Sequence, residues 1–171
     1  MQYHIRACTP DDLPALRQLS RKTFCDAFAH LNTPENMEAY LKKAFNEDTL
    51  LAELLNIHSY FYFLYMQDTL CGYLKLNDWE AQTDIHDPAS LEVERIYVLS
   101  GFQGSGLGGI LLNKAAELGE SLHKSYLWLG VWERNQGALR FYKRDGFYET
   151  GRHDFRLGQD KQTDYILRKD L

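Results

Sequence analysis

The fold is decided by the segment Arg95-Ile96-Tyr97-Val98-Leu99-Ser100-Gly101-Phe102-Gln103-Gly104-Ser105-Gly106-Leu107-Gly108-Gly109. An apolar, strand-like run leads into a turn with five glycines in nine residues, and a helical pattern follows from Gly106. The first amides of a helix have no intrahelical acceptor, and the positive end of the helix dipole lies beside them. Glycines let the backbone approach an anion closely. The segment therefore predicts a strand–loop–helix unit that binds a phosphate or pyrophosphate.

Two other phosphate-binding loops compete for the same residues. Gly104-x-Gly106-x-x-Gly109 fits the dinucleotide fingerprint, with Glu133 downstream as the ribose-binding acid. That fingerprint belongs to a series of βαβ units, whereas one short helix and a hairpin follow here. No Lys-Ser/Thr pair ends the loop, which excludes a nucleotide-triphosphate P-loop.

Hydrophobic periodicity and turn residues predict a mixed sheet with helices on its faces. The expected strands are Tyr3–Cys8, Ser59–Met66, Thr69–Asn77, Leu91–Val98, Ser125–Trp132, Phe147–Leu157 and Thr163–Lys169. The expected helices are one that starts at Thr9-Pro10-Asp11-Asp12, then Asn32–Phe45, Asp48–Asn56, Gly106–Leu122 and Asn135–Asp145. Without a repeat or a linker, residues 1–171 are expected to form one domain.

Composition narrows the function classes. The 171 residues are 44% hydrophobic and 25% charged, with a formal net charge of −5, which disfavours a nucleic-acid-binding protein. Cys8, Cys25 and Cys71 form no CxxC pair, so we expect reduced thiols in a cytoplasmic protein and neither a zinc knuckle nor a disulfide framework. No apolar window approaches the ~18 residues that a membrane span needs.

The charge is unevenly distributed along the chain. Residues 61–100 carry net −5, residues 1–60 net −2, and residues 101–171 net +2. The acidic block suits a cationic substrate and the basic end an anionic one, because complementary fields raise encounter rates. A purely solvated surface is the alternative.

Two spaced motifs together resemble those of the GNAT superfamily of N-acetyltransferases. Gln103-x-x-Gly106-x-Gly108 is similar to its acetyl-CoA loop, and Asn135-x-x-Ala138-x-x-Phe141-Tyr142-x-x-x-Gly146-Phe147 is similar to its second signature. The resemblance implies an α/β fold with a seven-stranded, mostly antiparallel mixed sheet whose central strands splay apart. It also implies acetyl transfer from acetyl-CoA to an amine by direct attack, with no metal.

The resemblance assigns catalytic roles to two residues. Tyr142 is the expected general acid, and Glu94 is the expected general base, because an aliphatic ammonium with a pKa of about 10.4 must lose a proton before it attacks. Tyr142 as a packed aromatic, and Glu94 as a solvated carboxylate or the partner of Arg95, are the structural alternatives. Glu92, two residues away, is expected on the same side of the strand.

The same resemblance implies that main-chain groups of one strand and the amides of the loop bind the cofactor. Lys143 and Arg144 approach the phosphates or remain a solvated face. Asn135 reaches the pantetheine or caps its helix. The expected cofactor-binding residues are Ile96, Tyr97, Val98, Gln103, Gly104, Ser105, Gly106, Leu107, Gly108, Gly109, Asn135, Tyr142 and Lys143.

Three segments, 91–98, 128–135 and 151–167, resemble the PaiA-type spermidine/spermine N-acetyltransferases. The implied acceptor is a small polyamine. We expect Phe28, Tyr40, Trp79, Glu92 and His153 to shape its pocket, together with Glu80 and the loop that follows it. His153 lines this pocket, acts as an auxiliary base, or serves as a structural hydrogen-bonding group.

Three functions remain open on the sequence alone. The first is an N-acetyltransferase of polyamines, the second one of peptide or protein N-termini or of amino acids, and the third a CoA-binding regulator without activity. The intact residues Gln103, Gly106, Gly108, Asn135 and Tyr142 argue against the third. Many members of the family are dimers, so a homodimer is also left open.

Overall fold

A computed structural model describes residues 2–171, apart from the side chain of Phe155. Seven strands form one sheet in the order β1-β2-β3-β4-β5-β7-β6, in which only β4 and β5 run parallel. The strands are β1 (Tyr3–Ala7), β2 (Ser59–Met66), β3 (Thr69–Asp78), β4 (Ser90–Val98), β5 (Tyr126–Trp132), β6 (Tyr148–Leu157) and β7 (Asp160–Asp170). The predicted mixed, mostly antiparallel sheet is confirmed.

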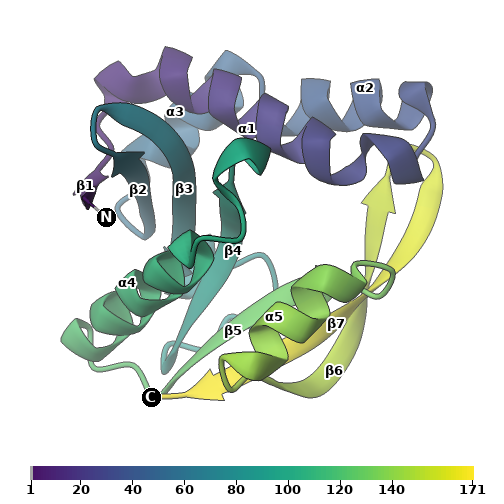
Figure 1. Ribbon diagram of the computed structural model, residues 1–171. Helices are drawn as coiled ribbons and strands as arrows, with labels where there is room; N and C mark the ends of the chain where they lie inside the picture. The colour runs from purple at the N-terminus through teal and green to yellow at the C-terminus, as the bar shows by residue number, and fades with distance from the viewer. Residues whose placement is uncertain (1) are drawn as a thin grey trace.

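Five α-helices cover the two faces of the sheet. They are α1 (Leu13–Phe28), α2 (Pro34–Ala44), α3 (Glu47–Leu55), α4 (Leu107–Ser121) and α5 (Gln136–Arg144). In Figure 1, α1 and α2 lie side by side across the top of the sheet, whereas α4 and α5 lie lower, α4 to the left of β4 and α5 in front of β5. None of the helices within residues 2–171 combines the length and apolar character needed to cross a bilayer.

The predicted element order is confirmed, and most boundaries agree to within one or two residues. Two boundaries differ from the prediction. Thr9 is an N-cap with Pro10 after it, as predicted, but of a 3₁₀ turn, Pro10–Asp12, that leads into α1 at Leu13. The last strand begins at Asp160 rather than Thr163, because Gly158 at φ +62° lets the chain reverse in a tighter turn.

Two hydrophobic cores lie on opposite faces of the sheet. Leu16 and Leu19 of α1 pack with α2, α3 and Phe63 of β2 on one face. Leu107 and Leu111 of α4 pack with α5 and with alternate residues of β3 to β5 on the other. β3 is buried on both faces from Cys71 to Asn77, and this buried run includes the polar side chains of Lys75 and Asn77.

The central strands β4 and β5 separate along their length. They are paired only from Ser90–Glu92 to Tyr126–Trp128 and diverge beyond that point, as Figure 1 shows. On its other edge, β4 follows β3 with a register shift that leaves Glu94 as the extra residue of a β-bulge, because Lys75 pairs with Arg95 and the next residue with Val93. The sheet therefore opens where the glycine-rich loop begins.

We predict that Gly72→Ala destabilises the protein by about 1–3 kcal/mol, because a Cβ at this position would lie 2.7 Å from the Tyr97 carbonyl oxygen on β4. Gly137→Ala is the control. It has open space and lies in the first turn of α5, where alanine should be neutral or slightly stabilising. Urea denaturation measures both changes. Equal stability of the two variants would show that β3 and β4 are not packed this closely.

Candidate active site

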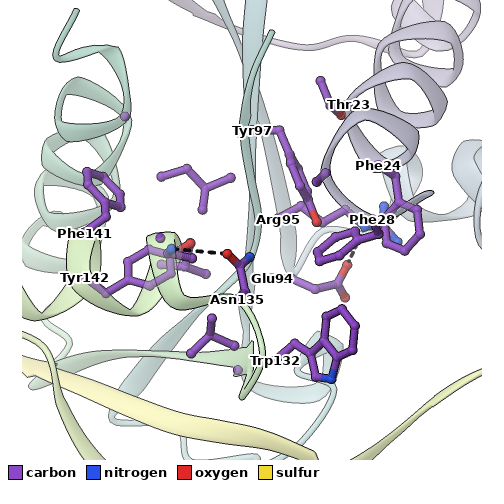
Figure 2. A pocket seen from close by; sticks show the side chains of 18 of the residues that line it. Thr23, Phe24, Phe28, Glu94, Arg95, Tyr97, Trp132, Asn135, Phe141 and Tyr142 are labelled. Atoms are coloured by element: carbon purple, nitrogen blue, oxygen red, sulfur yellow. Dashed lines mark hydrogen bonds and ion pairs between the residues drawn. The ribbon is translucent and has the colours of Figure 1, made fainter. Parts of the chain in front are cut away.

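A cavity of about 1410 Å³ lies where β4 and β5 separate. Residues of α1, the glycine-rich loop, α4 and α5 surround it, and residues of β4, β5, β6 and β7 complete its wall. In Figure 2, Tyr142 and Asn135 lie on one side of the opening, with Glu94, Phe28 and Trp132 on the other. The volume exceeds the ~300–1,000 Å³ that one small ligand usually needs, so two ligands can meet there.

The glycine-rich loop forms one end of this cavity. Gly104 (φ +80°) and Gly106 (φ +84°) adopt left-handed conformations that glycine tolerates best, and Gly106 is the N-cap of α4. The Gln103 side chain donates to the Val98 carbonyl at 3.0 Å, and Ser105 Oγ donates to the Phe102 carbonyl at 2.7 Å. The loop is thereby folded back on the end of β4. The first amides of α4, which lack intrahelical acceptors, lie at the cavity and fit an anionic phosphate group.

The last residues of β4 present main-chain groups to the gap between β4 and β5. Leu99 N donates to the Cys71 carbonyl on β3 at 2.8 Å. Because successive amides of a strand point in opposite directions, the Val98 amide faces away from β3 and toward the gap, and Ile96 has the same orientation. Ile96, Tyr97 and Val98 all line the cavity.

Helix α5 supplies the opposite wall. Asn135 Oδ1 accepts from the Ala138 amide at 3.2 Å, so Asn135 is the N-cap of α5 and also lines the cavity. A Cβ on Gly108 would lie 3.0 Å from the Phe141 ring, which shows how closely α4 and α5 pack. Tyr142 is 8% exposed, and burial raises the pKa of its hydroxyl well above the usual range, so it keeps its proton at neutral pH.

Of the predicted cofactor residues, two do not line the cavity. Lys143 is exposed on α5 and lies outside it, whereas its neighbour Arg144 is part of the wall. Ser105 also lies outside the lining, with its hydroxyl on the Phe102 carbonyl. The remaining predicted residues, from Ile96 to Gly109 and from Asn135 to Tyr142, meet at one site.

Glu94 projects from the bulge of β4 into a network of charges. Its carboxylate lies 2.9 Å from Lys75 Nζ and 3.1 Å from Arg95 Nε, and both cations also contact Glu53 of α3. The salt bridge to Arg95 considered from the sequence is therefore present. Burial alone raises the pKa of the Glu94 carboxyl, but Arg95 and Lys75 outweigh it and hold that pKa below its ordinary value. Glu94 is thus ionised at the cavity wall.

Glu92 lies on the same face, as expected, but its surroundings differ. It is 2% exposed and accepts hydrogen bonds from the Thr83 amide and hydroxyl. Asn77 Nδ2 lies between the two carboxylates and donates to Glu92 at 3.0 Å and to Glu94 at 3.1 Å. Burial, followed by the charge of Glu94, raises the pKa of Glu92. The pair therefore combines one stabilised carboxylate with one that holds a proton more readily.

The expected amine-pocket residues divide into two groups. Phe28, Tyr40, Glu92 and His153 line the cavity. Trp79 does not: its side chain is 50% exposed in a 3₁₀ turn after β3, and the adjoining Glu80 is also exposed outside the lining. The loop that follows reaches the cavity only through Thr83 and Asp84, because Thr83 is bound to Glu92.

A second cluster of polar side chains, His153, Asp164 and Asp84, also lines the cavity. His153 of β6 and Asp164 of β7 are cross-strand partners, with His153 Nε2 3.6 Å from Asp164 Oδ2. His153 Nδ1 lies 3.0 Å from the Asp84 carboxylate. Sequence reasoning missed Asp164 and the neighbouring Trp132. The available signal was that Asp164 lies on the same face of β7 as apolar Ile166, but only strand register reveals what lies opposite it.

The acidic block predicted between residues 61 and 100 contributes to the cavity only in part. Asp84, Glu92 and Glu94 line it. Asp78 instead pairs with Lys124, and Asp87 accepts from the Tyr126 hydroxyl. Across the described lining, seven Asp and Glu side chains stand against two Arg side chains and none of Lys. The cavity is therefore acidic, although less of the acidity comes from this block than its sequence indicated.

The profile of the acetyltransferase (GNAT) family matches residues 21–147, which include the glycine-rich loop, β4, β5 and α5. The chain belongs to this family. The GNAT chain is also 46% identical over 160 residues to an uncharacterized N-acetyltransferase of Lactobacillus delbrueckii subsp. lactis, an alignment that covers 94% of this chain and 92% of the relative. The expected family and enzyme class are thereby confirmed.

Two further relatives bear on the ligands. A spermine/spermidine N(1)-acetyltransferase of Bacillus subtilis is 27% identical over 93 residues, which are 54% of this chain and 61% of the relative. The crystal structure of the PaiA N-acetyltransferase of Thermoplasma acidophilum, solved in complex with coenzyme A, superposes with a TM-score of 0.81 over all of both chains at 21% identity. At that identity the second likeness concerns the GNAT fold.

The Asp164 carboxyl should make the stability of this GNAT protein pH-dependent. Burial raises its pKa from 3.8 to about 6, against the opposing charge of His153 and with a smaller contribution from Glu133. The folded state therefore binds a proton at a higher pH than the unfolded state. The stability that this proton provides is complete below about pH 4 and is lost as the pH rises through about 6.

We predict that Asp164→Asn reduces the fall in unfolding free energy between pH 5 and pH 7 by about 1–2 kcal/mol, measured by urea denaturation at both pH values. Asp170→Asn on the same strand is the control, because Asp170 is exposed and its pKa is lowered by Arg168, so it is ionised at both pH values. An unchanged pH dependence in Asp164→Asn would contradict the raised pKa.

Proposed function

We propose that this GNAT enzyme transfers the acetyl group of acetyl-CoA directly to a primary amine of a polyamine such as spermidine or spermine. The observation that carries the proposal is the position of the cavity. It opens between the separated strands β4 and β5, with the anion-binding end of α4 at one side and two carboxylates, Glu92 and Glu94, at the other.

The cofactor end of the cavity supports acetyl-CoA. When bound, acetyl-CoA supplies an activated acyl group as a thioester. The amides from Gln103 to Gly109 are suited to hold its pyrophosphate, because they lie at the start of α4 and carry no side-chain obstruction at Gly104 and Gly106. The outward-facing main-chain groups of Ile96 and Val98 are suited to pair with the pantetheine arm. The Val98 amide would then donate to the thioester carbonyl oxygen.

Glu94 is the proposed general base. It reaches the cavity with 16% of its side chain exposed, whereas the Glu92 carboxylate is bound by Thr83 and Asn77. An ionised Glu94 can attract the substrate ammonium and accept its proton directly or through water. Glu92, with its raised pKa, is the alternative proton acceptor, and Asn77 donates to both carboxylates.

Tyr142 is the proposed general acid. Its hydroxyl is buried beside the cavity, and its raised pKa keeps it protonated and able to donate to the leaving thiolate. Tyr142 lies across the cavity from Glu94 (Figure 2). Base and acid therefore approach the reacting centre from opposite walls.

The acidic lining supports a polycationic acceptor, because three of its carboxylates, Asp84, Glu92 and Asp164, have no Lys or Arg partner among the described residues and can attract cations. The similarity to the Bacillus subtilis spermine/spermidine N(1)-acetyltransferase is in accord with this choice. The direct test is release of CoA from acetyl-CoA in the presence of spermidine, spermine, amino acids and N-terminal peptides. Turnover of peptides with none of the polyamines would overturn the polyamine assignment.

We predict that Glu94→Gln lowers kcat by about 10²–10⁴-fold, because the amide cannot accept the proton, and that Tyr142→Phe lowers it by at least about tenfold. Steady-state CoA release with spermidine measures both. Glu117→Gln, on the exposed outer side of α4, is the matched control and should retain the wild-type rate. A larger loss in Glu92→Gln than in Glu94→Gln would transfer the role of base to Glu92.

The glycine-rich loop permits a separate prediction for the cofactor. Gly106→Ala should raise KM for acetyl-CoA by at least about tenfold, because alanine disfavours φ +84° and the shifted loop no longer aligns its amides. Gly101→Ala, also with open space around it but without a positive φ, should change KM little. An unaltered KM in Gly106→Ala would show that the loop geometry does not hold the cofactor.

A further inference from the structure

We propose that Asp164 is a specificity-determining residue that binds a second positive charge of the acceptor, at a subsite distinct from the Glu92–Glu94 pair. This inference rests on the proposed function, since it assumes that an amine enters the cavity. It concerns how the acceptor is chosen: an amine with a distant second ammonium group is favoured over an amine with one.

The Asp164 carboxylate is nearly buried yet lacks sufficient partners. The residue is 9% exposed and lines the cavity. Within residues 2–171 no group of the protein donates a hydrogen bond to Oδ1, and Oδ2 lies 3.6 Å from His153 Nε2. A buried carboxylate oxygen without a donor is costly unless a ligand supplies one.

The two acidic centres of the cavity, the Glu92–Glu94 pair and Asp164, differ in the number of cations that neutralise them. Glu94 already has Lys75 and Arg95 within 3.1 Å. Among the described residues, His153 is the one basic side chain that pairs with Asp164, and that imidazole also lies 3.0 Å from the Asp84 carboxylate. The pKa of Asp164, raised to about 6 chiefly by burial, agrees with a carboxylate that has no full positive partner of its own. An incoming ammonium group would provide the missing donor and the missing charge.

The walls around Asp164 suit an alkylammonium ion. Trp132 is the cross-strand partner of Asp164 on β5, and Phe28 of α1 lies 6.1 Å from the Trp132 ring. Aromatic faces attract ammonium groups and pack against methylene chains. Gly130, the next residue on that face of β5, has no side chain, and a Cβ there would lie within 3.4 Å of both His153 and Asp164. The absence of this side chain leaves the floor open between the two acidic centres.

The separation of the centres sets the length of the acceptor. Asp164 on β7 lies two strands from Glu94 on β4, in the sheet order β4-β5-β7. At a strand spacing of about 4.8 Å this corresponds to at least ~10 Å, and the divergence of β4 and β5 widens it. A short diamine cannot bridge this distance, whereas an extended triamine or a long diamine can.

Asp84, His153 and Asp164 do not form a metal site, since no group of three or more such side chains among the described residues is arranged to hold an ion. A purely structural role for Asp164 as partner of His153 is the remaining alternative. That role predicts equal effects on all acceptors, which makes the two accounts separable.

The test compares Asp164→Asn with wild type on spermidine and on a monoamine of similar length, such as nonylamine. We expect the ratio of kcat/KM for spermidine to that for the monoamine to fall at least tenfold in Asp164→Asn, and to be retained in Asp170→Asn. A ratio that is unchanged in Asp164→Asn, through equal losses or no loss, overturns the subsite. Circular dichroism confirms that the variants are folded.

Calorimetric titration with spermidine in the presence of CoA gives a second readout that does not need turnover. The expected result is a Kd at least tenfold weaker for Asp164→Asn than for wild type. If wild type releases no CoA with any amine, the proposed transferase function fails, while selective spermidine binding through Asp164 still supports the subsite. If wild type turns over amines but Asp164→Asn binds spermidine equally well, the subsite fails and the transferase function stands.

Discussion

The separation of β4 from β5 after Glu92 and Trp128 is the constraint on which the rest of the site depends. In a continuous parallel pair, the amides and carbonyls of Ile96 and Val98 would be bound to β5. Here β3 satisfies only one edge of β4. On the other edge the Val98 carbonyl accepts from the Gln103 side chain, and the remaining outward groups must find their partners in water or a ligand. The same opening brings the start of α4 and the N-cap of α5 to opposite sides of one cavity. It also lets the bulge at Glu94 direct a carboxylate into that cavity rather than into a packed sheet.

Charge within the cavity is organised by burial and pairing rather than by net composition. Lys75, Arg95 and Glu53 form a buried network with Glu94 that keeps this carboxylate ionised. Glu92 and Asp164 share the same face of the sheet but have no Lys or Arg partner among residues 2–171 whose side chains the structure describes, and burial raises the pKa of each. A buried charge without a counter-ion is unstable by itself and is stabilised by an opposite charge that enters. Glu94 is therefore neutralised by cations of the protein, whereas Glu92 and Asp164 can be neutralised by a cation that enters the cavity.

The sequence predicted correctly those features that depend on interactions between residues close together in the chain. The glycine-rich loop and α4 were predicted because left-handed glycines and free helix amides are local properties, and the Asn135 cap of α5 was predicted for the same reason. Glu92 and Glu94 were placed on one face from strand alternation, and the unforeseen bulge preserved that placement. Trp79 was misplaced because the path of an irregular loop depends on which side chain anchors it, here Thr83 on Glu92. Asp164 was missed because its importance depends on β5 and β6, which flank it in space.

The sequence by itself determined the order of the elements, the glycine-rich loop, and the motifs that identify the family, since each is encoded within a short run of residues. Only the tertiary structure decided which acidic residues share the cavity. In the folded sheet, Asp78 pairs with Lys124, and Asp87 accepts from the Tyr126 hydroxyl, both outside the cavity lining. Asp164 of β7 and Glu94 of β4 both line the cavity. The physical reason is that pKa, burial and ion pairing depend on neighbours fixed by strand order and register, and residues 70 positions apart become neighbours only when the sheet has formed.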